Sequence, residues 1–202
     1  MKILEYQFED VEHPGWKFDR VKFDKINLLV GDTATGKSRL LNTIFNLGRF
    51  TVSKEVKEFK NGSWVMVFQH EGITYDWTIR TEKRDDERKP GIVSSETLAS
   101  TFQGQTQQLI ERETSFFRFR GQDTPKLSLQ ETSISLLREE ELIKPVFKAF
   151  SIIGRRQFDR DALGTASDLQ VLPMSIVETM EKKKDLYALF TAELNVSVNL
   201  FI

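Results

Sequence analysis

The sequence contains no cysteine, only 5 prolines and no long hydrophobic run. Without cysteine, disulfides, zinc sites with thiolate ligands and thiol catalysis are excluded, which suits a reducing cytoplasm. The N-terminal MKILEYQFEDVEHPG carries acidic residues where a signal peptide needs an apolar core, and no stretch approaches the roughly 18 apolar residues of a membrane span. We therefore expect a cytoplasmic protein that does not insert into a membrane.

Net charge is almost absent as well, because 29 Lys and Arg face 30 Asp and Glu. A net charge of −1 gives no global electrostatic case for binding nucleic acid or an anionic membrane. One local mixture of Arg and Phe, Arg112 with residues 116–120, has the composition of a nucleic-acid contact, but its alternation is first of all that of a half-buried strand. With 202 residues, 39% of them hydrophobic, the chain is long enough for one good-sized globular domain, or one and a half.

Apolar and polar residues alternate in several short stretches, as they do in strands with one buried face. These stretches are residues 2–8, 16–23, 64–69, 73–80, 92–98, 108–111 and 116–120. Residues 26–30 form instead a continuous apolar run, which is typical of a strand buried on both faces. The charge-rich residues 81–91 are expected to be a solvated linker.

Helical spacing of apolar residues begins at Lys37 and predicts a helix that ends at Gly48. Further helices are expected at residues 133–143, from about Pro145 onward, and at residues 175–193. The chain stops on the apolar run VSVNLFI, which is either a strand docked on a sheet or the cut edge of a longer protein.

The predicted buried strand and the first helix flank GDTATGKS, residues 31–38, which fits the pattern G-x-x-x-x-G-K-[ST]. Glycine lets such a loop turn its backbone N–H groups toward a polyphosphate, and the helix N-terminus adds its own unpaired N–H groups and dipole. The strand before it and the helix after it are the context that this loop requires. The segment therefore predicts a phosphate-binding loop, the Walker A motif, rather than a glycine-punctuated turn.

The residue types in the loop indicate ATP with Mg²⁺. Lys37 would place its ammonium on the β- and γ-phosphate oxygens, and Ser38 would offer its hydroxyl to the metal ion. The predicted ATP-binding residues are Gly31, Asp32, Thr33, Ala34, Thr35, Gly36, Lys37 and Ser38, with Ser38 as the Mg²⁺ ligand.

Hydrolysis needs a further carboxylate at the end of another buried strand, where it holds Mg²⁺ and orients water. The best stretches after the loop fail, because SISLLREE is interrupted by Arg138 and VSVNLFI simply ends. The Asn-Lys-x-Asp pattern of guanine specificity is also missing, so a GTPase is disfavoured. We predict ATP binding without a catalytic residue in this chain.

Residues 1–50, from MKILEYQF through GDTATGKSRLL to NLGRF, resemble the start of the ATPase heads of the SMC/RecF/OLD type, which are ABC-like AAA ATPases of the P-loop NTPase superfamily. Residues 75–77, 95–98 and 109–112 are weakly similar to the antiparallel sheet that follows in that group. The resemblance implies an α/β fold in which residues 1–125 form an ABC-type nucleotide-binding lobe. That lobe has a mixed and antiparallel β-sheet around the P-loop helix, and residues 126–202 continue it as a mostly helical segment.

Such heads also carry an LSGGQ-like signature, an Asp-Glu pair and often a switch histidine in a C-terminal half, whereas His13 and His70 lie too early. The resemblance therefore implies the N-terminal part of a longer ATPase. In that family two heads sandwich ATP head to head, each supplying the signature serine to the other, and the ATPase serves DNA maintenance or phage defence, which makes nucleic acid a partner by analogy alone. Candidates for the glutamine that bridges to Mg²⁺ are Gln69, Gln103 and Gln157, and candidates for stacking on adenine are Trp16 and Phe18.

Two other functions stay open at this point. A degenerate ATPase would act as a non-enzymatic module that binds nucleotide or a protein partner. A small-molecule kinase would use the same loop, but the long antiparallel stretch of residues 64–120 argues against its compact lid.

Overall fold

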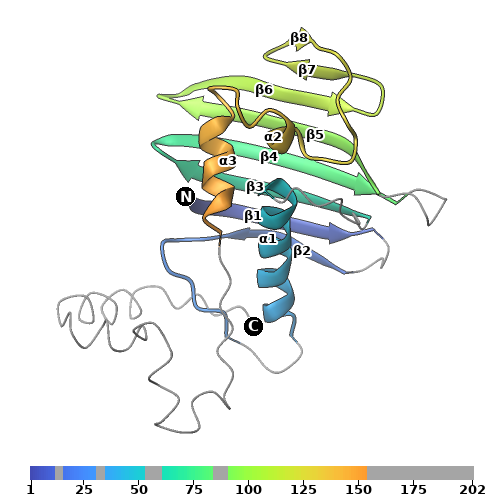
Figure 1. The fold of residues 1–202 in the computed structure, drawn as a ribbon. Helices are drawn as coiled ribbons and strands as arrows, with labels where there is room; N and C mark the ends of the chain where they lie inside the picture. The colour runs from blue at the N-terminus through green and yellow to red at the C-terminus, as the bar shows by residue number, and fades with distance from the viewer. Residues whose placement is uncertain (12–15, 31–34, 53–60, 84–90, 154–202) are drawn as a thin grey trace, which may run out of the picture. The chain divides into compact units, whose positions relative to one another are not determined.

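The computed structural model describes residues 1–11, 16–30, 35–52, 61–83 and 91–153. One compact unit comprises Met1–Lys25 and Gly36–Ile153, and it contains all the helices and strands of the described residues (Figure 1). The strands are β1 (Lys2–Asp10), β2 (Lys17–Lys22), β3 (Gly62–His70), β4 (Ile73–Glu82), β5 (Ile92–Phe102), β6 (Gln105–Glu113), β7 (Phe117–Phe119) and β8 (Gln122–Asp123). The helices are α1 (Lys37–Val52), α2 (Ser133–Leu136) and α3 (Lys144–Ser151).

The strands form one sheet in the order β2-β1-β3-β4-β5-β6-β7-β8, and every neighbouring pair is antiparallel. From β3 to β8 the chain simply meanders. β2 and β3 both run antiparallel to β1, which lies between them, so the connection that carries α1 joins two strands of the same direction. This crossover is what brings α1 onto a face of the sheet.

Three hairpins of the meander share one turn chemistry, a two-residue loop that ends in glycine. Both residues of each loop have positive φ, which is the type I′ geometry whose twist matches that of the flanking strands. The pairs are Glu71 and Gly72, Gln103 and Gly104, and Arg120 and Gly121, with φ between 50° and 80°. The turns therefore fix the register of β3 with β4, β5 with β6, and β7 with β8.

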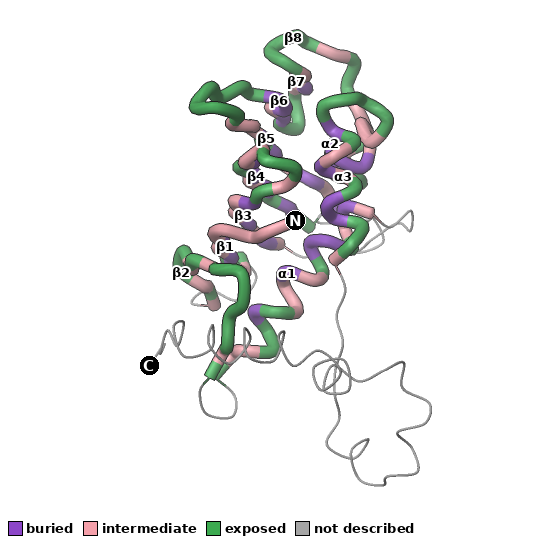
Figure 2. The backbone as a smooth tube through the Cα atoms, turned by 90° about the vertical axis from the view of Figure 1, so that its left-hand side faces the viewer, coloured by how far each residue is buried: buried purple, intermediate pink, exposed green. Residues whose placement is uncertain are grey.

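All three helices lie on one face of the sheet, and the buried residues of strands and helices face each other across this interface (Figures 1 and 2). Aromatic side chains dominate the layer between them. Phe150 of α3 packs edge-on against Phe68 and Trp77, with ring centroids 5.2 and 5.0 Å apart, and Phe68 stacks on Tyr75 at 5.1 Å. The alternation that predicted β3 and β4 is thus confirmed by which side chains are buried.

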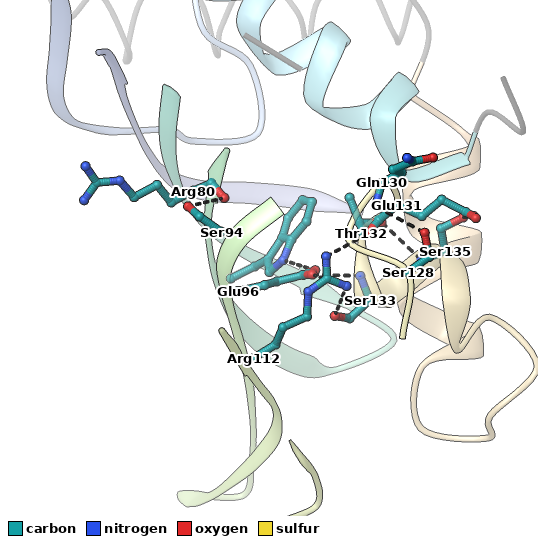
Figure 3. Close-up of polar contacts among 11 residues, drawn as sticks. Arg80, Ser94, Glu96, Arg112, Ser128, Gln130, Glu131, Thr132, Ser133 and Ser135 are labelled. Atoms are coloured by element: carbon teal, nitrogen blue, oxygen red, sulfur yellow. Dashed lines mark hydrogen bonds and ion pairs between the residues drawn. The ribbon is translucent and has the colours of Figure 1, made fainter. Parts of the chain in front are cut away.

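A buried charged cluster fastens the chain around α2 to the sheet (Figure 3). The Glu96 carboxylate on β5 accepts hydrogen bonds from Trp77 Nε1 at 3.0 Å and from the Ser133 backbone N–H at 2.7 Å. Arg112 on β6 lies 3.8 Å from the same carboxylate and donates to Ser133 Oγ and to the Glu131 carbonyl. Both charged side chains are about 1% exposed. Burial lowers the pKa of Arg112, and the charges of Glu96 and Glu131 oppose that shift.

The expected α/β fold of a P-loop NTPase is wrong for the described residues. That fold needs parallel strands with helices around them, whereas the described sheet is antiparallel throughout and carries its helices on one face. Residues 26–30, the expected buried strand before the loop, are not one of its eight strands, and Ile26, Leu28 and Val30 are exposed. A short continuous apolar run does not by itself define a strand, because neighbouring strands must be there to pair with it.

Two helix boundaries also differ from expectation. α1 does not end at Gly48 but continues to Val52. The glycine allows close packing instead of ending the helix, since a Cβ there would lie 3.1 Å from the Ile153 side chain. The helix expected at residues 133–143 ends at Leu136. The acidic residues 139–141 follow, and negative charge at a helix C-terminus opposes its dipole. α3 begins as expected, with Pro145 in its first turn.

The solvated linker expected at residues 81–91 is wrong at its start, because Thr81 and Glu82 belong to β4 and Thr81 is buried. Residues 84–90 of that linker, the helix expected at residues 175–193 and the terminal VSVNLFI lie outside the described residues. The domain boundary at residues 125 and 126 stays a prediction. In the described part of the chain, no helix is long and apolar enough to cross a membrane.

We predict that Glu96→Gln lowers the free energy of unfolding by about 3–5 kcal/mol, because it leaves the Arg112 charge buried without its counter-ion. The matched control is Glu111→Gln on the neighbouring strand, whose half-exposed pair with Arg118 spans 3.5 Å and is worth at most about 1 kcal/mol. Chemical denaturation of both variants measures the difference. Equal, small losses would contradict the role given to the buried cluster.

Candidate functional site

The predicted phosphate loop is described only at its C-terminal end. Residues 31–34, which include Gly31, Asp32, Thr33 and Ala34, lie outside the described residues. Thr35 is exposed and immediately precedes the compact unit, Gly36 precedes α1, and Lys37 and Ser38 are the first two residues of that helix. The chemistry of the site therefore depends on the first turn of this helix.

Gly36 immediately precedes α1, in a backbone conformation that favours glycine. Its φ is +92°, and its carbonyl accepts the first helical hydrogen bond from Leu40 N at 2.9 Å. The helix itself offers no acceptor to the backbone N–H groups of Ser38 and Arg39, because they lie in its first turn. A Cβ at Gly36 would lie 3.8 Å from the Phe18 ring, so space alone does not require glycine here.

The charges at this end of α1 are the reverse of what a helix dipole favours. The first turn contains no acidic residue, and it carries Lys37 and Arg39, although the dipole makes a helix N-terminus positive. Ser38, between them, is exposed. Two cations and the first-turn N–H groups of a helix together attract an anion.

Arg39 is exposed, and its guanidinium lies over an aromatic ring. Its guanidinium carbon lies 3.2 Å from the centroid of Trp16, a cation–π contact. Trp16 in turn packs edge-on against Phe18 at 5.2 Å and Phe8 at 5.5 Å. Trp16 and Phe18 were the two candidates for stacking on adenine. Arg39 covers one face of the Trp16 ring, and Phe18 packs beside Gly36.

The candidate glutamines are not gathered at the start of α1. Gln69 pairs with Lys2, at the beginning of β1. The start of α1 lies near the opposite end of that strand, because Phe18, which packs beside Gly36, pairs with Phe8. Gln103 forms the turn between β5 and β6, and Gln157 lies outside the described residues. Within the described ranges, no three His, Asp or Glu side chains cluster so that they could hold a metal ion.

A pocket of about 330 Å³ lies between α1 and the β1 and β3 end of the sheet, and we call it the α1 pocket. Its described lining consists of Phe8, Asp10, Trp16, Asn61 and Trp64 from the sheet side and Arg39, Asn42, Thr43, Asn46 and Phe50 from α1. The sequence patterns did not lead us to predict it. The sequence did contain one signal for it. The polar residues at positions 42, 43 and 46 form a stripe along one side of the helix, next to the buried apolar side formed by positions 40, 44 and 47.

Buried polar groups without hydrogen bonds collect beside this pocket. In the described residues, Asn42 Oδ1, Trp64 Nε1 and the Tyr6 hydroxyl are among the few such atoms. Burial raises the pKa of Tyr6, and the Thr43 and Trp64 side chains beside its hydroxyl offset that rise in part without reaching hydrogen-bond geometry. Each unpaired group costs about 1–3 kcal/mol, so their concentration in one place needs a reason.

No protein-family model matches this chain, and no curated protein matches it either. The assignment of nucleotide chemistry therefore depends on the GDTATGKS pattern and on the geometry at the start of α1.

We predict that Gly36→Ala lowers the free energy of unfolding by about 1–3 kcal/mol, because a side chain is strained at this positive φ although it has room. Gly36→Asn should lose less, since asparagine tolerates left-handed backbone better than alanine. Urea denaturation compares the two variants. If both are as stable as the parent, the conformation described for Gly36 is not required by the fold.

Proposed function

We propose that this chain binds Mg-ATP with its phosphates at the N-terminal end of α1. The observation that carries the proposal is the glycine of positive φ at the end of GDTATGKS, followed directly by the helix that begins at Lys37. This is the local geometry through which a phosphate loop delivers an anion to a helix start. The proposal does not require the sheet of a P-loop NTPase, which the described residues do not form.

Each residue of the first turn has a separate role in this proposal. The backbone N–H groups of Ser38 and Arg39 donate to phosphate oxygens, and the Lys37 ammonium neutralises the β- and γ-phosphates as a point charge. The hydroxyl of Ser38 is exposed at this end of the helix and supplies one ligand to Mg²⁺. The remaining Mg²⁺ ligands would be phosphate oxygens and water, which is the usual way this ion is held.

The proposal is one of binding without hydrolysis by this chain alone. In the sequence after the loop, no run of four apolar residues leads convincingly into an Asp or Glu, the pattern that marks the carboxylate needed for water activation. We propose that a second head, arranged head to head, or another partner chain completes the site in the cytoplasm. Robust ATP turnover by the purified chain would contradict this part of the proposal.

The alternative function is a nucleotide-binding module without catalysis. It would bind Mg-ATP in the same way as the ATPase proposed above, but no hydrolysis would follow. In both cases the nucleotide stabilises the folded chain by mass action, because it binds the folded state and not the unfolded one. Nucleic acid is proposed as a partner only because the sequence resembles ATPase heads of the SMC/RecF/OLD type. Arg112 takes no part in such a surface, because it is buried against Glu96.

We predict that Lys37→Ala abolishes measurable binding of Mg-ATP in isothermal titration calorimetry. A charge-assisted hydrogen bond is worth about 1.5–3 kcal/mol, so each one that is removed raises Kd about tenfold to hundredfold. Removing Mg²⁺ with a chelator should weaken binding by the parent chain.

The control is Lys22→Ala, which removes one exposed lysine from the nearby strand β2. It changes the net charge by the same amount and should leave Kd unchanged within about twofold, because its charge is solvent-screened. If Lys37→Ala folds and binds Mg-ATP as tightly as the parent, the assignment of the phosphate site is wrong.

A further inference from the structure

We infer that the α1 pocket binds a planar, uncharged ring with hydrogen-bonding groups on its edge, the chemistry of a nucleobase. The pocket lies wholly within the compact unit of residues 1–25 and 36–153. Its volume of about 330 Å³ is at the lower end of the ~300–1,000 Å³ range of small-molecule sites. It therefore suits a ligand of one or two fused rings.

The sheet side of the α1 pocket is an aromatic wall. Phe8 packs against Trp64 with ring centroids 5.1 Å apart, and from the helix side Phe50 of α1 meets the same indole edge-on at 6.3 Å. Trp16 extends this cluster from Phe8. Aromatic walls favour flat ligands, because a ring can stack on one side chain and meet the edge of another with little loss of conformational entropy.

The helix side of the α1 pocket is an amide wall. Asn42, Thr43 and Asn46 follow one another at helical spacing and line the pocket together. The Thr43 hydroxyl already donates to the Leu40 carbonyl at 2.8 Å, so the two asparagines are the groups that this wall offers to a ligand. Asn46 is exposed and Asn42 is half-buried. A ring that stacks on the aromatic wall presents its edge to these amides.

An unpaired polar atom gives the strongest indication of a ligand. Asn42 Oδ1 is an acceptor that is buried without a hydrogen bond, on a residue that lines the pocket. The Trp64 indole N–H is unpaired as well, but the Trp64 side chain lies beside the Tyr6 hydroxyl, so this donor does not by itself point to a ligand. A ring with a donor on its edge pairs the Asn42 oxygen, whereas an aliphatic ligand leaves it unpaired.

Charge on the α1 pocket is balanced. Asp10 and Arg39 both line it, one from β1 and one from α1, and Arg39 lies over Trp16. Opposite charges select neither an anion nor a cation, so the lining suits a neutral ring. Such a ring has two sources: the base of the nucleotide proposed above, since Asn42 is only about 7.5 Å along the helix axis from Lys37, or a separate heterocycle.

The experiment uses nucleosides, which carry the ring without phosphate. Adenosine, guanosine and cytidine are titrated into the full chain and followed by calorimetry and by ligand-observed NMR. We expect at least one to bind with Kd below about 1 mM. Asn42→Leu and Asn46→Leu should each raise that Kd at least about tenfold, which corresponds to the loss of one hydrogen bond worth about 1.4 kcal/mol. Asn42→Leu should not lower the unfolding midpoint, because it removes an unpaired buried carbonyl.

Gln107→Leu is the control, because it makes the same kind of amide-to-leucine change at an exposed position of β6. Its Kd should equal that of the parent. Should Asn42→Leu fail to fold, Asn46→Leu decides, since Asn46 is exposed. Absence of nucleoside binding by the parent, or unchanged Kd in the folded asparagine variants, would overturn the inference.

Lys37→Ala separates this inference from the proposed ATP site, because nucleoside binding should survive that change while Mg-ATP binding is abolished. Displacement of the nucleoside by Mg-ATP identifies the ring as the base of the same nucleotide. Simultaneous binding of both identifies a separate heterocycle. Each of these two results supports the pocket as a ring-binding site.

Discussion

The position of the helices depends on one carboxylate, that of Glu96, in the middle of the sheet. Its charge is buried, and it is held by the Trp77 indole, by the Ser133 backbone N–H and by the nearby Arg112. A buried charge is tolerated only with such partners, so the cluster fixes where the chain around α2 meets β5 and β6. α3 follows from there, and α1 packs against it, with Gly48 allowing the close approach of Ile153.

The two proposed sites both depend on where α1 is held. Its sheet-facing side is apolar at Leu40, Ile44 and Leu47, and the neighbouring polar stripe faces the α1 pocket. Its N-terminal end carries Lys37 and Arg39 where a helix dipole is unfavourable to cations. Arg39 belongs to both sites, since it stands in the first turn and also lines the pocket over Trp16. Phosphate chemistry and ring chemistry thus meet along one helix.

The sequence was sufficient for the parts of the fold that depend on local alternation. β3 and β4 were predicted from the period-two alternation of apolar and polar residues at 64–69 and 73–80. The pattern could not show that residues 26–30 are outside the sheet, because strand pairing is a tertiary property. It gave no sign of the Glu96 cluster, since a charged residue in a strand is normally expected to be exposed. The start of α1 was predicted from the helical spacing of apolar residues after Lys37, whereas the α1 pocket needed that helix, β1, β3 and the residue before β2 to be placed together.

Backbone amide shifts of the ¹⁵N-labelled chain during titration with Mg-ATP test the central claim most directly. We expect saturable shift changes at Gly36, Ser38 and Arg39, at the start of α1, and no such changes in Lys37→Ala. Saturable binding whose shifts are confined to another part of the described sheet, such as β7 and β8, would contradict the proposed site. So would the absence of any shift change at the start of α1 at millimolar nucleotide.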